Sequence, residues 1–434
     1  MSRWSLFRLG LYQLGAGIVS VLLLGVLNRV LRVEMGLDLL VVGIVVGGGH
    51  YLGALAAMPF GYFSDRHPFW GLHRTPFIIG GIGLVCLALA AAPFVVRELA
   101  MRGGGIWVAG AFVFFLLEGI ATYIAGTAYL ALITDLTAER DRGRAVALVW
   151  TLLMGGILAG VFFTVITLRE YSFASLSLSF AVAAGSVLTL AIAALWHQEP
   201  RATAKPRQNQ GASFSESFKM LASSRPARCF FAFLVVGLFA TFMQDVVLEP
   251  FGGEVLKLPV RATSLFNAYQ MVGVIAAMWV GGARLIPRYG KEKVTAWGAW
   301  VQAGAFALLA VSSVLQWAWL ANPAILALGI GMGLFTVGGV SLMMDMTQTG
   351  QTGLFVGAWT LAQALAKGPA AVASSGLHNA ARAIGAEPAA AYATVFLVEA
   401  AGLAVAVWLL HRVGVPRFSR EAVPFSSVLT QSVD

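Results

Sequence analysis

Charged residues are scarce in this sequence. Asp, Glu, Lys and Arg together account for 11% of its 434 residues, whereas soluble globular domains carry about 25%. Hydrophobic residues account for 59%, and apolar stretches of roughly 20 residues, each long enough to cross a bilayer, fill most of the chain. The composition therefore excludes an ordinary soluble enzyme and predicts an integral membrane protein whose solvent is the lipid bilayer.

Cysteines and catalytic motifs are scarce as well. The two cysteines, Cys86 and Cys229, lie in or beside apolar stretches and lack the spacing of metal ligands. The sequence contains no Walker loop, dinucleotide fingerprint, Cys/His cluster or nucleophile elbow in a strand-turn-helix context. We therefore assign no catalytic residue and no metal site, and nothing in the sequence argues for an enzyme.

Basic residues outnumber acidic residues by 29 to 20. In a soluble chain this excess would suggest a nucleic-acid partner, but in a membrane protein Lys and Arg collect in cytoplasmic loops. With both termini placed inside, twenty basic residues fall on the cytoplasmic side and eight fall outside. The sequence therefore predicts two cytoplasmic termini and no nucleic-acid partner.

Apolar windows between polar breaks predict twelve membrane-spanning helices. The first window follows basic residues, as in a signal peptide, but its apolar run continues to Leu27 without a small-residue cleavage site, so we expect it to be retained. The predicted spans are 10–31, 37–62, 76–96, 106–130, 145–168, 173–196, 229–248, 263–283, 294–316, 321–344, 352–375 and 390–411.

One long polar segment, from His197 to Arg228, divides the spans six against six. The halves correspond, because the second and the eighth connections each place a basic loop after a glycine that ends a span, at Gly61 and Gly282. This arrangement is typical of the major facilitator superfamily, so we expect an all-α membrane protein with twelve transmembrane helices in a 6+6 bundle. The predicted parts are an N-terminal bundle (1–196), a cytoplasmic linker (197–228), a C-terminal bundle (229–411) and a cytoplasmic tail (412–434).

Two ionisable side chains are predicted near the middle of the membrane, where such groups are costly unless paired or hydrated. Glu118 lies about 12 residues into the fourth span, roughly 18 Å deep, and Thr122 and Tyr123 follow it one turn later. Its carboxyl group is a candidate protonation site, ligand contact or helix-helix hydrogen bond. His50, in the second span, either offers a ring nitrogen to a metal such as the magnesium of a chlorin or bonds a neighbouring carbonyl. These four residues form our candidate ligand site.

Acidic residues gather at the predicted end of the seventh span. Asp245 and Glu249 are four residues apart, which places both carboxylates on one helical face. We expect Pro250 and the glycines at 252–253 to stop the helix near the outer surface. This face either binds a cation or a basic partner, as a docking or gating element, or anchors the loop before the eighth span. The candidate docking or gating residues are Gln244, Asp245, Glu249 and Glu254.

Lys367 and Glu399 are predicted to lie at similar depths. Lys367 is about 8 residues before the outer end of the eleventh span and Glu399 about 9 residues after the outer start of the twelfth, so both would be roughly 12–14 Å below the outer surface. An ion pair avoids an isolated charge at that depth. We therefore predict a structural pair with a nitrogen-to-oxygen separation under about 4 Å, with a proton-carrying Glu399 as the alternative.

Four stretches of the sequence are distinctive, namely 25–30 (GVLNRV), 64–76 (SDRHPFWGLHRTP), 134–136 (TDL) and 243–256 (MQDVVLEPFGGEVL). They resemble the PucC family of light-harvesting assembly proteins. The resemblance covers essentially all twelve spans, and the fourth stretch is specific. Within the second stretch, Asp65, Arg66 and Arg74 form a cytoplasmic loop motif. Several residues, Gly71 among them, separate Arg66 from Arg74, and this departure from the general transporter pattern disfavours ordinary sugar or drug transport.

The resemblance implies a protein of phototrophs that helps to assemble chlorophyll- or bacteriochlorophyll-binding antenna complexes. It would handle pigment, nascent light-harvesting antenna polypeptides or both, with chlorophyll or bacteriochlorophyll as bound cargo, in a cytoplasmic, intracytoplasmic or thylakoid membrane. Members of this family have also been called bacteriochlorophyll synthase, but prenylating a chlorophyllide requires acidic clusters for pyrophosphate and Mg²⁺ on the cytoplasmic side, and the sequence has none. The alternative function is proton-coupled secondary transport of a small solute through Glu118.

Overall fold

The structure is a computed structural model of the chain, and it describes residues 3–56, 69, 71–137, 142–199, 225–345 and 352–413. Asp65 and Arg66 of the predicted loop motif lie outside the described residues. So do most of the predicted linker (197–228) and most of the predicted tail (412–434).

Helices make up nearly all of the described N-terminal half. The first span, Trp4–Glu34, alternates between α-helical and π-helical segments. The second does the same until its last segment, which is a 3₁₀ helix. Segments of the first span are α1 (Arg3–Ser20), η1 (Val21–Val26), α2 (Leu27–Arg29) and η2 (Val30–Glu34). Segments of the second are α3 (Leu39–Val42), η3 (Gly43–Gly48), α4 (Gly49–Leu52) and η4 (Gly53–Ala56). The remaining helices are α6 (Thr75–Arg102), α7 (Gly105–Leu136), α8 (Arg142–Thr167) and α9 (Phe173–Leu195).

The C-terminal half repeats the pattern of six spans. Its first span is α11 (Arg225–Phe242) followed by α12 (Gln244–Glu254), and its second is α13 (Val260–Val280) continued by η6 (Gly281–Leu285) and α14 (Ile286–Tyr289). The other spans are α15 (Lys291–Leu315), α16 (Ala318–Asp345), α17 (Thr352–Ala383) and α18 (Pro388–Val413).

Within the described residues, ten helical segments are long and apolar enough to cross a membrane. The second span contributes a shorter apolar helix, Leu39–Leu55, and α17 contributes 32 residues. The predicted all-α fold of twelve transmembrane helices is therefore confirmed.

Local sequence signals set several helix ends. The Asp38 carboxylate accepts the N–H of Leu40 at 2.8 Å and caps the second span. Ser172 and Ser175 form a capping box at the start of α9. Gly103 and Gly104 have φ of 60° and 81° and reverse the chain between α6 and α7, a conformation that favours glycine.

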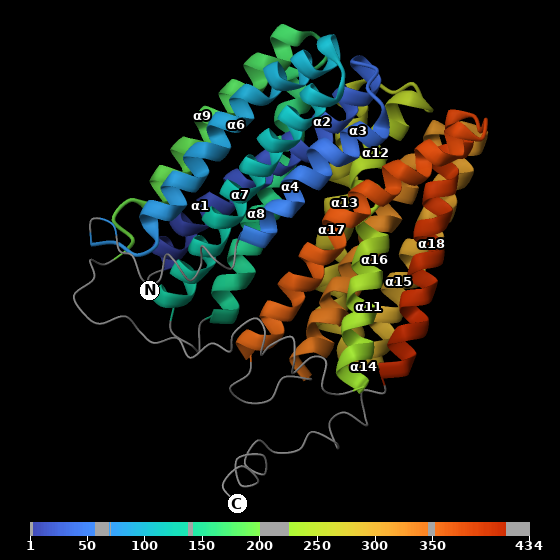
Figure 1. Ribbon diagram of the computed structural model, residues 1–434. Coiled ribbons are helices and arrows are strands. Elements are labelled where there is room, and N and C mark those ends of the chain that lie inside the picture. The colour runs from blue at the N-terminus through green and yellow to red at the C-terminus, as the bar shows by residue number, and fades with distance from the viewer. Residues whose placement is uncertain are drawn as a thin grey trace, which may run out of the picture.

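The two halves lie side by side, and the start of α1 and the end of α18 are at the same end of the bundle (Figure 1). We call the opposite end, where α2, α3 and α12 lie, the far end. The halves contact each other where η3 meets α17. A methyl group at Gly47 would lie only 2.5 Å from Cβ of Ala371, so glycine at this position allows the two helices to pack closely.

The predicted end of the seventh span is wrong. The helix turns at Met243 but then continues as α12 through Pro250 to Glu254. Inside a bilayer no water is available to satisfy freed backbone groups, so helical structure persists past a proline that neighbouring helices can accommodate. The glycines at 252 and 253 serve close packing, because Cβ atoms there would crowd Phe266 of α13 and Val33 of η2. Asp245 is therefore nine residues, about 13 Å, below the end of the helix.

Candidate functional site

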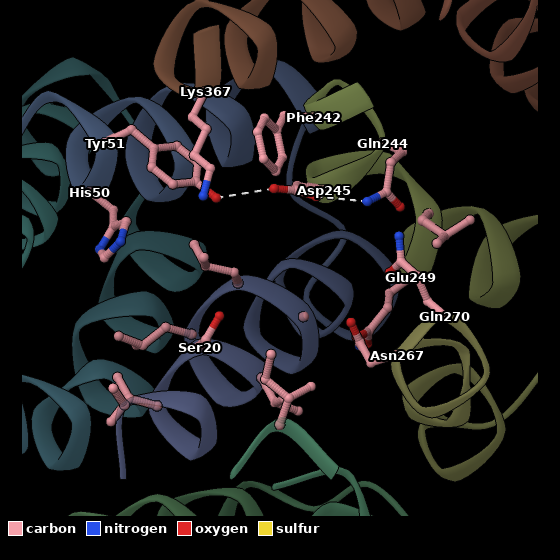
Figure 2. Close-up of a pocket in the computed structure, with 18 of the residues that line it drawn as sticks. Ser20, His50, Tyr51, Phe242, Gln244, Asp245, Glu249, Asn267, Gln270 and Lys367 are labelled. Atoms are coloured by element: carbon pink, nitrogen blue, oxygen red, sulfur yellow. Dashed lines mark hydrogen bonds between the residues drawn. The ribbon is translucent and has the colours of Figure 1, made fainter. Parts of the chain in front are cut away.

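A cavity of about 340 Å³ lies between the two halves of the bundle. Spans from both halves line it, and Figure 2 shows polar side chains entering it from several directions. The π-helical segment η1 faces it through Gly25 and Leu24, and such local widening of a helix is frequent at functional sites. Central cavities at the junction of two repeats are where this class of fold binds its ligands, so this cavity is the candidate functional site.

His50 and Glu118, predicted as separate candidates, are in direct contact. Nδ1 of His50 lies 2.7 Å from Oε2 of Glu118, and Thr122 donates its hydroxyl to Oε1 of the same carboxylate at 2.8 Å. The Glu118 side chain is fully buried, so the helix-helix hydrogen bond considered for it is present. His50, Thr122 and Tyr123 line the cavity, and Glu118 lies behind the first two.

This contact orients the imidazole ring. With Nδ1 facing Glu118, Nε2 is the nitrogen that remains available to a ligand in the cavity. A carboxylate on one ring nitrogen fixes the tautomer and the orientation of the other, which is the usual second partner of a metal-binding histidine. Tyr51 and Tyr123 pack against the ring with centroid separations of 5.1 and 5.8 Å. His50 is thus held in place to present Nε2.

Two hydrogen-bond donors hold the Asp245 carboxylate at the side of the cavity. The Tyr51 hydroxyl donates to its Oδ2 at 3.1 Å, and the Gln244 amide donates to its Oδ1 at 2.7 Å. The Lys367 ammonium group lies 4.3 Å from the ring centroid of Phe242 and 5.5 Å from that of Tyr51. Figure 2 shows this ammonium group beside the Tyr51 hydroxyl that bonds Asp245. The Asp245 carboxylate and the Lys367 ammonium group therefore face each other beside the rings of Tyr51 and Phe242.

The predicted Lys367–Glu399 pair is wrong. Lys367 lines the cavity, whereas both carboxylate oxygens of Glu399 are buried without a hydrogen-bond partner in the part of the chain that the structure describes. Depth along a helix, the basis of that prediction, says nothing about rotation around its axis. The Lys367 ammonium group therefore does not reach the Glu399 carboxylate.

Glu249 lies at the opposite side of the cavity from His50 (Figure 2). Asn267 of α13 donates its amide to Oε1 at 2.6 Å, while Oε2 is buried without a hydrogen-bond partner among the described residues. Gln270, one turn from Asn267, also lines the cavity and donates to the sulfur of Met332 at 3.0 Å. The predicted location of Asp245 and Glu249 near the outer surface is therefore wrong, because α12 is longer than expected.

Glu254 does lie at the far end, where it joins the two halves. Arg32 of the first span donates to both of its carboxylate oxygens, each at 2.8 Å, and the Tyr392 hydroxyl of α18 donates to Oε2 at 2.8 Å. Bidentate pairs of this kind are the strongest side-chain hydrogen bonds. We call these three residues the far-end cluster. It connects the seventh and twelfth spans to the first.

Further polar contacts close the same end. Arg29 forms an ion pair with Glu34 at 2.6 Å and donates to the carbonyl of Leu258 at 2.9 Å. Asn379 of α17 hydrogen-bonds the Asp38 carboxylate that caps the second span. Contacts across the halves therefore link the first span to the loop after α12, and the second span to the eleventh.

Arg74 of the predicted loop motif lies at the end of the bundle that holds the termini. Its guanidinium is 3.5 Å from the Asp135 carboxylate at the end of α7, which joins two of the stretches that carry the family resemblance. Glu199 accepts the backbone N–H groups of His73, Arg74 and Thr75 and thereby caps α6. Sequence inspection overlooked Glu199, because its partners are 124 to 126 residues away.

Three residues of the site do not appear among the sequence-based candidates, and a fourth was placed elsewhere. Tyr51, Asn267 and Gln270 are the three, although two amides three residues apart in an apolar span are a detectable signal. The fourth is Lys367, which was predicted to pair with Glu399. All four line the cavity.

A family model described as "PUCC protein" matches residues 26–418. The chain belongs to the PucC family. It is 31% identical to "Protein PucC" of Rhodovulum sulfidophilum over 386 residues, which cover 86% of this chain and 84% of the relative. It is 30% identical to "Protein PucC" of Rhodobacter capsulatus over 420 residues, covering 93% and 90%. A third relative, "Bacteriochlorophyll synthase 44.5 kDa chain" of Rhodobacter capsulatus, is 29% identical over 378 residues, covering 84% of each.

The fold is of the major facilitator type. The crystal structure of nucleoside transporter NupG matches with a TM-score of 0.70, covering 95% of this chain and 99% of that one at 14% sequence identity. This likeness confirms the predicted 6+6 architecture.

Proposed function

We propose that this protein is an assembly factor for photosynthetic light-harvesting complexes, which handles chlorophyll-type pigment, nascent antenna polypeptides or both within the membrane. The observation that carries the proposal is the family match over residues 26–418. Relatives named PucC align with almost the whole chain, so the role belongs to the complete twelve-span bundle rather than to one part of it.

The size of the cavity refines this role. Pockets for drug-sized ligands span roughly 300–1,000 Å³, and the cavity, at about 340 Å³, is at the lower end of that range. A chlorophyll-type pigment with its macrocycle and long alcohol tail exceeds this space. In this conformation we therefore expect pigment or antenna helices to engage the lipid-facing surface, with at most part of a pigment reaching Nε2 of His50.

The proposal includes a location and a topology. The protein would reside in a cytoplasmic, intracytoplasmic or thylakoid membrane with both termini in the cytoplasm, which the excess of basic residues at that end supports. It would have no enzymatic activity, because the sequence lacks the acidic clusters that prenyl transfer to a chlorophyllide requires.

Copurification tests the proposal. The tagged chain is expressed in a phototrophic bacterium from which its own family members have been deleted, and extracted in mild detergent. We expect chlorophyll-type pigment or antenna polypeptide to copurify above the level seen with an unrelated twelve-span transporter, and antenna absorbance in the membranes to recover. Neither copurification nor recovery, with the protein present at normal level, would exclude the assembly role.

A second candidate function, secondary transport of a small solute, has its own support. The support is a polar cavity between the two halves, together with an ion pair between Arg32 and Glu254 that joins the halves at the far end. Alternating access requires closure of this kind on one side of a central cavity. Asp245, Glu249 and Lys367, which line the cavity, are better placed for this than Glu118, which lies behind it. Uptake of labelled solutes into proteoliposomes under a proton gradient would distinguish transport from assembly.

A further inference from the structure

We propose that the Glu249 end of the central cavity binds a small organic ammonium compound, a positively charged amine attached to an apolar body. This site is independent of the assembly role, and its ligand is neither a pigment nor an antenna polypeptide.

The first observation is an unpartnered carboxylate oxygen. Glu249 is only 4% exposed, and its Oε2 has no hydrogen-bond partner in the described part of the chain, although the residue lines the cavity. A buried carboxylate oxygen without a donor is costly. A donor supplied by a ligand in the cavity would remove that cost.

The second observation concerns the neighbouring amides. Gln244 donates its Nε2 to Asp245, Asn267 donates its Nδ2 to Glu249, and Gln270 donates its Nε2 to Met332. Each amide spends one of its two N–H groups on a partner inside the protein and keeps a carbonyl oxygen that can accept a hydrogen bond. Carbonyl oxygens beside the Glu249 carboxylate suit a ligand with several N–H donors and a positive charge.

The hydrogen bonds of the charged groups around Glu249 are consistent with an ammonium ligand at this end of the cavity. Asp245 has two hydrogen-bond donors and faces Lys367, so it is compensated from within the protein. Arg29, whose positive charge also acts on Glu249, donates hydrogen bonds to Glu34 and to the Leu258 carbonyl and none to Oε2 of Glu249. Glu249 is thus the carboxylate of the cavity that retains an unfilled acceptor.

Cavity size and lining favour an organic cation over a bare metal ion. A water molecule occupies about 30 Å³, and an inorganic ion is comparably small, whereas the cavity measures about 340 Å³. Leu24, Leu248 and Met271 line it beside the polar groups. These side chains suit a carbon skeleton, and methionine sulfur also packs favourably against aromatic rings.

Calorimetric titration of the full-length protein in detergent at pH 7 tests the proposal, with 2-phenylethylammonium chloride as the probe. The matched controls are 2-phenylethanol, which has the same shape without the charge, and sodium chloride. We expect the ammonium compound to bind at least tenfold more tightly than the alcohol, and Glu249→Gln to weaken its binding at least tenfold. Glu98→Gln, which neutralises an exposed carboxylate on α6, should leave binding unchanged.

Several results would overturn the proposal: no binding to the unmodified protein, equal binding of alcohol and amine, undiminished binding to Glu249→Gln, or the same heat from sodium chloride alone. If Glu249→Gln does not fold, Met271→Trp provides the second test, because it fills the cavity while retaining the carboxylate and should also abolish binding. Antenna accumulation is measured on the same variants. Loss of amine binding with normal antenna accumulation separates this site from the assembly role.

Discussion

At the scale of single residues, the contact between His50 and Glu118 connects stability to the candidate site. A carboxylate that is fully buried in the membrane depends on its two donors, His50 and Thr122. Removing one member of a buried pair leaves the other unsatisfied, while removing both often costs less.

We therefore expect Glu118→Leu alone to destabilise the protein by about 2 kcal/mol or more. Adding His50→Leu should recover a large part of that loss. Titration with SDS, followed by circular dichroism, measures both variants. Equal stability of Glu118→Leu and the unmodified protein would show that the contact is unimportant for folding.

Lys367 and Glu399 allow a test of two buried groups that are not in contact. Because their side chains do not meet, the effects of Lys367→Met and Glu399→Leu should add, with a coupling energy under about 0.5 kcal/mol. A double-mutant cycle of unfolding free energies measures this value. A coupling of several kcal/mol would mean that the two groups do pair in the membrane.

At the scale of secondary-structure elements, α12 determines which acidic residues face the cavity. Its continuation through Pro250 places Asp245 and Glu249 inside the protein and leaves Glu254 at the far end. The glycines near its end allow α12 to pack closely against α13, since a Cβ at Gly252 would lie only 2.6 Å from the Phe266 ring.

Gly252→Ala is therefore expected to destabilise the protein by about 1–3 kcal/mol through overpacking. Gly80→Ala in α6 is the matched control, because a Cβ there meets nothing within 4 Å and alanine favours a helix by up to about 1 kcal/mol. Thermal unfolding in detergent compares them. Equal melting temperatures for the two variants would contradict the close packing of α12.

At the scale of the whole molecule, the far-end cluster holds the halves together on one side. Arg32, Glu254 and Tyr392 come from three different spans, and charged hydrogen bonds of this kind contribute about 1.5–3 kcal/mol each. Weakening the cluster should favour a conformation in which the far end separates.

Glu254→Gln should raise the population of that conformation about tenfold, which corresponds to about 1.4 kcal/mol. Spin labels at Met101→Cys and Ile384→Cys, on the far-end sides of the two halves and in a background without Cys86 and Cys229, report the separation by pulsed electron paramagnetic resonance. Glu98→Gln serves as the control. An unchanged distance distribution in Glu254→Gln would exclude a gating role for the cluster.

The sequence by itself determined the membrane location, the twelve spans and the 6+6 division, because hydrophobicity is a local property that composition and length record directly. It also singled out His50 and Glu118, since their expected depth follows from counting residues along a helix.

Only the tertiary structure decided which groups meet. Rotation about the helix axis brought Lys367 to Asp245 rather than into contact with the Glu399 carboxylate. The seventh span continues as α12 past Pro250. The contact between Arg32 and Glu254 joins residues 222 positions apart, which no local pattern records. Packing of the two halves brought Asn267, Gln270 and Glu249 to one cavity. No local pattern predicts this, because the direction of a side chain depends on how its helix packs against its neighbours.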